Sequence, residues 1–171
     1  METLKAIEMR KATRSFKKNQ ISEKDLEVIL KAACSAPVGR GQYDTVRLTV
    51  VQSQDLIDKV SKAAGKVTGN PDFRPFYEAP TVIVVSSQIS GLNLEYANVA
   101  CIMENMLLAA TDLSLGSVYI WGGIQGFQAE PDLIRELGVP EGFIPISAAA
   151  IGYATDPTEA PKKHEIVINR I

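Results

Sequence analysis

The chain has 171 residues, of which 46% are hydrophobic and 22% charged, and its formal net charge is -2. This composition is typical of a globular protein, and the length suits a single domain over residues 1–171. Binding to nucleic acid or to an anionic membrane needs a basic surface, which a slightly acidic chain does not provide. We therefore expect no nucleic-acid or membrane partner, and any recognition of anions must be local.

The sequence indicates neither a targeting signal nor a metal site. The N-terminus carries Glu2 and Glu8 and no long apolar run, so we expect no signal peptide. The two cysteines, Cys34 and Cys101, lie on apolar helix faces without CxxC spacing. We therefore expect two buried, reduced thiols in a cytoplasmic protein. One histidine and two distant cysteines do not form a zinc-binding pattern.

In the first part of the chain, the pattern predicts a helix over 2–13 with Leu4 and Ile7 on one side. A second helix begins after Ser22, a candidate N-cap with Asp25 in the capping-box position. This helix must end before Pro37. The β-branched stretch that follows, residues 45–51, predicts a strand.

The middle of the chain predicts a capped helix, an irregular connection and a buried strand. The helix covers 53–65 and ends at Gly65. Residues 66–80 contain several prolines and glycines, which favour a loop. Residues 81–87 are continuously apolar and β-branched apart from their last two serines, which is typical of a central strand buried on both faces.

The longest predicted helix covers 94–115, is ended by Gly116 and is apolar nearly all round. A helix of this kind is buried on all sides, which a short chain achieves either at a dimer interface or under a sheet. A strand over 117–121, a short helix within 130–140 with Pro131 near N1 and Gly138 at C′, and a strand over 143–153 follow. The short apolar tail is expected to dock on a sheet, in this chain or in a partner. Four strands and about five helices predict an α+β layer fold.

Five of the 18 basic residues fall within positions 10–18. If residues 10–14 are helical, Arg10 and Arg14 share a face and repel each other by about 0.2–0.5 kcal/mol. One interpretation is a solvated helix end, where the macrodipole favours cations. The other is that Arg10, Lys11 and Arg14 surround an anion such as a phosphate.

Three further stretches allow both a structural and a functional interpretation. APVGRGQY (36–43) is either a plain helix-to-strand loop or a glycine-rich segment that approaches a ligand. LGSVYIWGG (115–123) places the only tryptophan either in the core or beside a planar ligand. PKKH (161–164) is either a solvated tail or a second basic site.

No stretch contains a Ser-His-Asp pattern, a Walker A loop or a GxGxxG motif. With a single histidine in the tail, histidine-based catalysis has weak support. If the protein is an enzyme, an organic cofactor is therefore expected to carry the chemistry.

Four stretches, in this order, resemble motifs of the nitroreductase family of FMN-dependent oxidoreductases. RKATRSF is similar to that family's opening pattern R-[RH]-S-x-[RK]-x-[FY], and APVGRGQYDTVRLTVV is similar to its A-P-S-x-x-N-x-Q-P-W loop. ENMLLAATDLSLGSVYIWG is similar to its long helix and turn, and AAAIGYATDPTEAPKKHEI to its I-G-Y-P stretch followed by K-x-R. The resemblance implies a nitroreductase-like α+β fold, with a mostly antiparallel sheet flanked by helices, in an intertwined homodimer.

The resemblance also implies where FMN binds. Arg10, Lys11 and Arg14 would meet the flavin phosphate, the ribityl chain and the N1/O2 edge, with Arg14 as the stabiliser of that edge. Ala12 stands where the family has serine, which leaves only backbone contact. The turn over 120–123 would cover the ring near N5, through Ile120, Trp121, Gly122 and Gly123.

The remaining implied contacts come from the partner subunit and the tail. Pro37, Val38 and Gly39 would line the flavin from the other subunit, with Gln42 kept, while Val38 and Gly41 replace the family's serine and asparagine. Lys162 and His164 stand at the phosphate-binding K-x-R position. Histidine in place of arginine is expected to make phosphate binding weaker or dependent on pH. Arg74 is a further candidate for flavin contact.

The implied function is hydride or electron transfer from NAD(P)H to nitroaromatics, quinones or related small acceptors, by ping-pong turnover on FMN. An alternative is a flavin-binding or storage protein without a defined reductase substrate, and a third is a structural dimer that has lost flavin. No protein side chain is expected to react itself. The chain is shorter than is common in the family, so we expect a more open substrate pocket.

Overall fold

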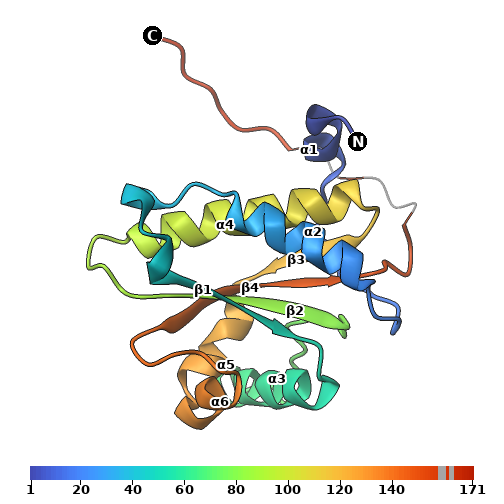
Figure 1. Cartoon of the computed structure of the whole chain (residues 1–171). Coiled ribbons are helices and arrows are strands. Elements are labelled where there is room, and N and C mark those ends of the chain that lie inside the picture. The colour runs from blue at the N-terminus through green and yellow to red at the C-terminus, as the bar shows by residue number, and fades with distance from the viewer. Residues whose placement is uncertain (158–160, 162–163) are drawn as a thin grey trace.

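A computed structural model describes residues 1–157, 161 and 164–171, and for Phe127 the backbone alone. A four-stranded antiparallel sheet separates two layers of helices (Figure 1). The α+β fold with a central antiparallel sheet is confirmed. In the order in which they lie across the sheet, the strands are β1 (Val46–Val51), β2 (Thr81–Ser87), β4 (Ile144–Gly152) and β3 (Gly116–Ile120).

The helices divide between the two faces of this sheet (Figure 1). One face is covered by α2 (Glu23–Cys34) and α4 (Leu94–Asp112), and α1 (Thr3–Met9) lies against α4. The other face carries α3 (Gln54–Thr68), α5 (Gln125–Gln128) and α6 (Pro131–Glu136). Short 3₁₀ turns lie at Gly39–Gly41, Tyr43–Thr45 and Gly122–Ile124.

Strand β2 is buried along its whole length, as predicted. Val82 and Val84 pack into the core between the sheet and α3, whereas Ile83 and Val85 pack into the core under α2 and α4. A strand covered on both faces has no position for a solvated side chain. This explains why apolar and polar residues do not alternate along its sequence.

The predicted start of α2 is confirmed in detail. The backbone N–H of Asp25 donates to Ser22 Oγ at 3.1 Å, and Ser22 Oγ donates to the Asp25 carboxylate at 2.7 Å. These two bonds satisfy one of the free N–H groups of the first turn and fix the entry of the chain into the helix.

The prediction of a helix over 2–13 is wrong in its second half. Helix α1 ends at Met9, and Arg10 has φ -59° and ψ 126°, which is extended backbone. Ala12 then pairs with Ser117 in a parallel bridge, and the Thr13 N–H donates to the Ser117 carbonyl at 2.9 Å. The physical reason is that β3 is an edge strand, whose unpaired backbone groups accept a neighbouring segment.

Two other helix ends differ from prediction because a glycine serves close packing. Helix α3 continues through Gly65 to Thr68 and is capped by Gly69 at φ 67°. A Cβ at Gly65 would lie 2.8 Å from the Asn70 carbonyl oxygen. Helix α4 ends at Asp112, and Gly116 opens β3 instead, where a Cβ would lie 2.8 Å from Thr13 Cγ2.

Helix α4 is not buried all round. The side chains of Asn98, Met103 and Met106 face the interior, whereas those of Tyr96 and Cys101 are exposed. We call the uncovered side the outer strip of α4; its members are Tyr96, Ala97, Ala100, Cys101 and Glu104. The expected burial of both cysteines is also wrong, because Cys101 lies on this strip and Cys34, the last residue of α2, points to solvent.

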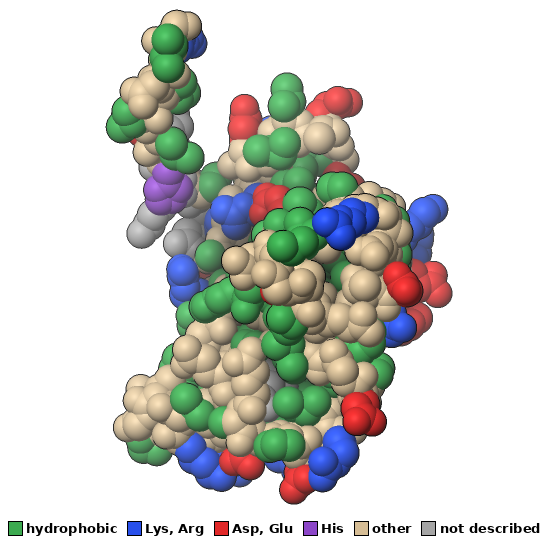
Figure 2. Space-filling model, turned by 90° about the vertical axis from the view of Figure 1, so that its left-hand side faces the viewer, with side chains coloured by type: hydrophobic (Ala, Val, Ile, Leu, Met, Phe, Trp, Pro, Cys, Tyr) green, Lys and Arg blue, Asp and Glu red, His purple; other side chains and the backbone are tan. Residues whose placement is uncertain are grey.

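The C-terminal segment stands away from the body and carries hydrophobic side chains into solvent (Figure 2). Ile166, Val167 and Ile168 are 87%, 89% and 76% exposed. Within one chain, the tail therefore does not dock on the sheet. In the part of the chain that the structure describes, no helix has the length and hydropathy of a membrane span.

Candidate functional site

The basic segment, residues 10–14, lies alongside edge strand β3. The bridge between Ala12 and Ser117 is parallel, so the segment runs in the same direction as β3. Arg10 precedes this bridge and Arg14 follows it. After Arg14 the segment leaves β3, because the Thr155 N–H donates to the Ser15 carbonyl at 3.2 Å and Phe16 pairs with Ala154. Four residues separate Ser117 from Trp121, which corresponds to about 13 Å of strand.

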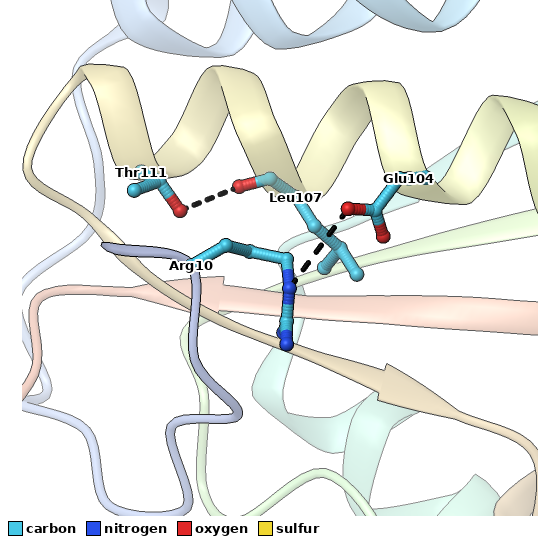
Figure 3. A network of polar contacts seen from close by, with 4 residues as sticks. All are labelled: Arg10, Glu104, Leu107 and Thr111. Atoms are coloured by element: carbon cyan, nitrogen blue, oxygen red, sulfur yellow. Dashed lines mark hydrogen bonds and ion pairs between the residues drawn. The ribbon is translucent and has the colours of Figure 1, made fainter. Parts of the chain in front are cut away.

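Arg10 reaches along the second half of α4 (Figure 3). Its Nε lies 3.8 Å from Glu104 Oε1, and its side chain is 31% exposed. Beside it, the Thr111 hydroxyl donates to the Leu107 carbonyl within the helix at 2.9 Å. A partly exposed ion pair at this distance contributes at most about 1 kcal/mol. An anionic ligand can therefore replace Glu104 as the partner of Arg10.

The other two predicted cations differ in their surroundings. Lys11 lines a cavity of about 260 Å³ together with Thr13, Thr111 and Ser114. An ammonium group beside hydroxyls is a suitable environment for the oxygens of an anion. Arg14 is exposed and, within the described ranges, forms no ion pair or hydrogen bond. Its guanidinium group is therefore free to meet a ligand.

At the other end of β3 lies the turn with the only tryptophan. Trp121 is 53% exposed, so the core interpretation is wrong for this residue, and its ring centroid lies 6.0 Å from that of Tyr96. A Cβ at Gly122 would meet no heavy atom within 4 Å, whereas one at Gly123 would lie 2.5 Å from Pro75 Cβ. Gly123 thus fixes the turn against the protein, while Gly122 leaves an open surface for a flat ligand.

The loop over 36–42 lies at the start of α4. Val38 is buried, and the Gly39 N–H donates to Asn98 Oδ1 at 2.8 Å. Arg40 and Gly41 follow with positive φ values of 59° and 65°. Pro37 and Gln42 are exposed. The loop is therefore fixed to α4 on its inner side by the bond to Asn98 and presents its outer side to solvent.

Sequence reasoning missed two polar residues that support this loop, Asn98 and Glu95. Both line a cavity of about 170 Å³ next to Gly39. Glu95 is 2% exposed, and its Oε2 accepts from Ser90 Oγ at 2.6 Å and from the Ser90 N–H at 3.2 Å. The Ser90 hydroxyl holds the pKa of the Glu95 carboxyl below its usual range. In the sequence, Asn98 and Glu95 could have been noticed as polar residues within a helix that is mostly apolar.

A single chain brings together some of the predicted residues and not others. Strand β3 carries the basic segment near its start and the Trp121 turn at its end. The loop over 36–42 contacts α4 at Asn98, 13 positions before Thr111, which corresponds to about 20 Å of helix. The loop is therefore remote from the Lys11 cavity within one chain. Lys162 lies outside the described residues, and His164 is exposed in the tail.

Comparisons with known proteins agree with this architecture. The model of the family described as "Nitroreductase family" matches residues 7–153. A nitroreductase from Bacteroides fragilis, solved with bound FMN, superimposes with a TM-score of 0.84 at 27% identity, covering 100% of this chain and 97% of the other. A nitroreductase from Desulfitobacterium hafniense with bound FMN has a TM-score of 0.88 at 24% identity, over 99% and 100% of the two chains. The fold is that of the nitroreductases.

Two relatives of known sequence extend the comparison. An Archaeoglobus fulgidus protein, whose assigned name combines NADH dehydrogenase and NAD(P)H nitroreductase, is 32% identical over 160 residues, which are 91% of this chain and 87% of the relative. The FMN reductase [NAD(P)H] of Bacillus subtilis is 26% identical over 199 residues, or 99% and 76% of the two chains. The chain belongs to the nitroreductase family, and the resemblance seen in its motifs is confirmed.

Proposed function

We propose that this chain, an FMN-dependent oxidoreductase of the nitroreductase family, takes electrons from NAD(P)H and passes them to small acceptors such as nitroaromatics or quinones. The observation that carries the proposal is the order of groups along β3. Cations lie near one end of the strand, and an open glycine turn lies at the other. FMN has the same polarity, with a phosphate at one end and a flat ring at the other, and when bound it supplies the transfer of electrons.

In this proposal the phosphate and ribityl chain lie near Arg10 and Lys11. Arg10 exchanges Glu104 for the phosphate, and the charge-assisted bond that forms is stronger than the ion pair that it replaces. Lys162 adds positive charge from the tail, and His164 stands two positions after it. A local cluster of this kind is what an acidic protein needs to hold a phosphate.

The ring end is assigned to Arg14 and to the turn at the end of β3. Arg14 has no partner among the described residues, so its guanidinium group can stabilise negative charge that develops at the N1/O2 edge. Ile120, Trp121, Gly122 and Gly123 would lie near N5, and the open face at Gly122 would let the backbone approach the ring. Ala12 offers only its backbone. The residues present therefore fit FMN.

The second wall of the site comes from another copy of the chain in an intertwined homodimer. The loop that carries Pro37, Val38, Gly39 and Gln42 lies about 20 Å along α4 from the Lys11 cavity in one chain, so these residues would reach a ligand bound there from another copy. Apart from Glu104, the outer strip of α4 presents apolar and aromatic side chains to solvent in one chain, and so do the exposed residues Ile166, Val167 and Ile168. Burial of both surfaces against a second copy removes them from water and supports the dimer.

The experiment is steady-state oxidation of NADH or NADPH with nitrofurazone or menadione as the acceptor. We expect turnover that depends on bound FMN. A protein that retains FMN and is reduced by light, yet turns over neither nucleotide, would instead support a flavin-binding or storage protein. Ala12, Val38, Gly41 and His164, which replace the family's usual residues, are the observation that favours this second candidate.

The site assignment is tested by comparing Arg14→Ala with Lys18→Ala. We expect Arg14→Ala to lower the FMN content of the purified protein and Lys18→Ala to leave it close to that of the wild type. Both residues are exposed cations, four positions apart, so a general effect of charge would act on both. Equal FMN content in the two variants would contradict the placement of Arg14.

A further inference from the structure

A cavity of about 380 Å³ lies on the α3 side of the sheet. Of the residues that line it, only Arg74 was a candidate for flavin contact from the sequence, and the flavin site proposed above does not use it. It opens between the first half of α3 and the segment 74–80. Its most notable residues are three cations from separate segments: Lys18, Lys62 and Arg74. We call it the α3 cavity.

The three cations have no acidic partner among the residues that the structure describes. Within the described ranges, none of them forms an ion pair within 4.0 Å. Two carboxylates, those of Asp58 and Glu78, also line the cavity, so its net charge is +1. Asp58 already accepts from Gln54 Nε2 at 2.9 Å. The cavity is thus locally cationic in a chain whose net charge is -2.

One of the cations is fixed in place. Arg74 Nη1 donates to the carbonyls of Pro71 and Phe73 at 3.0 and 3.1 Å. These bonds orient the guanidinium group and leave its other N–H groups available. A planar fork held in one orientation is the arrangement that recognises a phosphate by paired hydrogen bonds.

The cavity is lined by buried apolar residues and by a segment with strained backbone. Ile57 and Phe76 line it and are 3% and 1% exposed. The strained segment contains two consecutive residues with positive φ, Tyr77 at 53° and Glu78 at 59°. Such a conformation costs about 1–3 kcal/mol per residue outside glycine, and it is concentrated where a protein clamps a ligand. The cavity can therefore accept a ring below a phosphate.

The α3 cavity is joined to the turn at the end of β3. Arg74 is followed by Pro75, whose ring packs so closely on Gly123 that a Cβ there would lie 2.5 Å away. The proposed function places the flavin N5 beside this same turn. A dinucleotide donor that presents its nicotinamide at N5 extends its adenosine end past the turn, toward Arg74.

We propose that the α3 cavity binds the phosphorylated adenosine end of the donor, and that Lys18, Lys62 and Arg74 hold its 2′-phosphate. The inference rests on the proposed function for the position of the nicotinamide. NADH lacks this phosphate and leaves the three cations without a partner. The enzyme therefore prefers NADPH over NADH.

The test measures ligand binding to the purified protein by calorimetry, without turnover. The probes are 2′,5′-ADP, 5′-AMP and inorganic phosphate. We expect 2′,5′-ADP to bind at least about tenfold more tightly than 5′-AMP, because a charge-assisted hydrogen bond contributes more than a neutral one. We expect Lys62→Ala to abolish that preference and to lower the ratio of kcat/KM for NADPH over NADH about tenfold.

The matched control is Lys59→Ala. Lys59 lies on α3 three positions before Lys62, but it pairs with Glu136 outside the cavity. We expect this variant to keep the preference for 2′,5′-ADP. Equal binding of 2′,5′-ADP and 5′-AMP to the wild type, or equal losses in the two variants, would overturn the site.

Two outcomes separate this inference from the proposed function. If inorganic phosphate binds as tightly as 2′,5′-ADP, the assignment to the adenosine end is overturned. If 2′,5′-ADP binds in a Lys62-dependent manner while neither NADPH nor NADH is oxidised, the site stands and the proposed oxidoreductase activity fails. Thermal unfolding of Lys62→Ala confirms that the variant is folded, as expected for an exposed side chain.

Discussion

Replacing Asn98 by alanine tests whether the loop over 36–42 is part of the flavin site. Asn98 is 8% exposed and accepts the Gly39 N–H at 2.8 Å. The variant loses this bond and leaves the N–H group without its partner, which costs about 1–3 kcal/mol. Because Gly39 itself is only half-buried, we expect the lower part of that range.

The loss has two measurable consequences. A destabilisation of about 1–2 kcal/mol lowers the Tm of a protein of this size by about 2–8 °C. The freed loop must also be ordered again when FMN binds, and about 1 kcal/mol of that cost weakens FMN binding about fivefold. Tm is followed by thermal unfolding at fixed protein concentration, and the FMN dissociation constant by flavin fluorescence.

Asn105 offers a matched control on the same helix. Its Nδ2 donates to the Ala32 carbonyl at 3.0 Å, which joins α4 to α2 and not to the loop. We expect Asn105→Ala to lower Tm by a similar amount and to leave FMN affinity unchanged. If both variants weaken FMN equally, or if Asn98→Ala does not weaken it, the reasoning about the loop is refuted.

Three further predictions concern the fold. A Cβ at Gly126 would lie 2.3 Å from the Ala64 backbone nitrogen. Because neither helix backbone can yield, Gly126→Ala is expected to lower the free energy of unfolding by about 3 kcal/mol. An unchanged unfolding midpoint in denaturant would contradict this packing. Ser90 lowers the pKa of Glu95, so ionised Glu95 stabilises the fold above about pH 4.3. The Tm difference between wild type and Glu95→Gln should therefore become smaller as the pH is lowered from about 6 to about 3. A difference that does not change with pH would contradict a stabilising role of ionised Glu95. Deletion of 165–171 is expected to convert dimer to monomer in light scattering, and an unchanged mass would exclude the tail from the interface.

Local sequence signals were sufficient for most of the fold. The capping box at Ser22 and the apolar run of β2 act through neighbouring residues, so they can be read without knowing the topology. The end of α1 cannot be read in this way. No proline or glycine interrupts residues 10–16, and the segment becomes extended only because β3, a hundred positions later, offers an unpaired edge.

Glycines and cysteines were misread for a related reason. Gly65 looks like a helix end, but its lack of a side chain serves the close approach of the Asn70 carbonyl. Cys101 lies in an apolar helix, and an apolar pattern does not tell which side the same chain covers. Both questions depend on tertiary or quaternary neighbours, which a single sequence does not display.

The candidate site was predicted unevenly. The family motifs located the basic segment and the turn at Trp121, and the structure brings both to strand β3. Glu95 and Asn98 were missed because they act on the loop through hydrogen bonds rather than on a ligand. Their roles depend on distances to Ser90 and Gly39 that no spacing in the sequence reveals.

The most direct test of the central claim is anaerobic titration of the purified protein with NADPH while the visible absorbance of bound flavin is followed. The account predicts a yellow protein whose flavin absorbance is lost on addition of NADPH and returns on addition of menadione. A colourless protein that does not take up added FMN would contradict it. So would a bound flavin whose absorbance neither NADPH nor NADH changes.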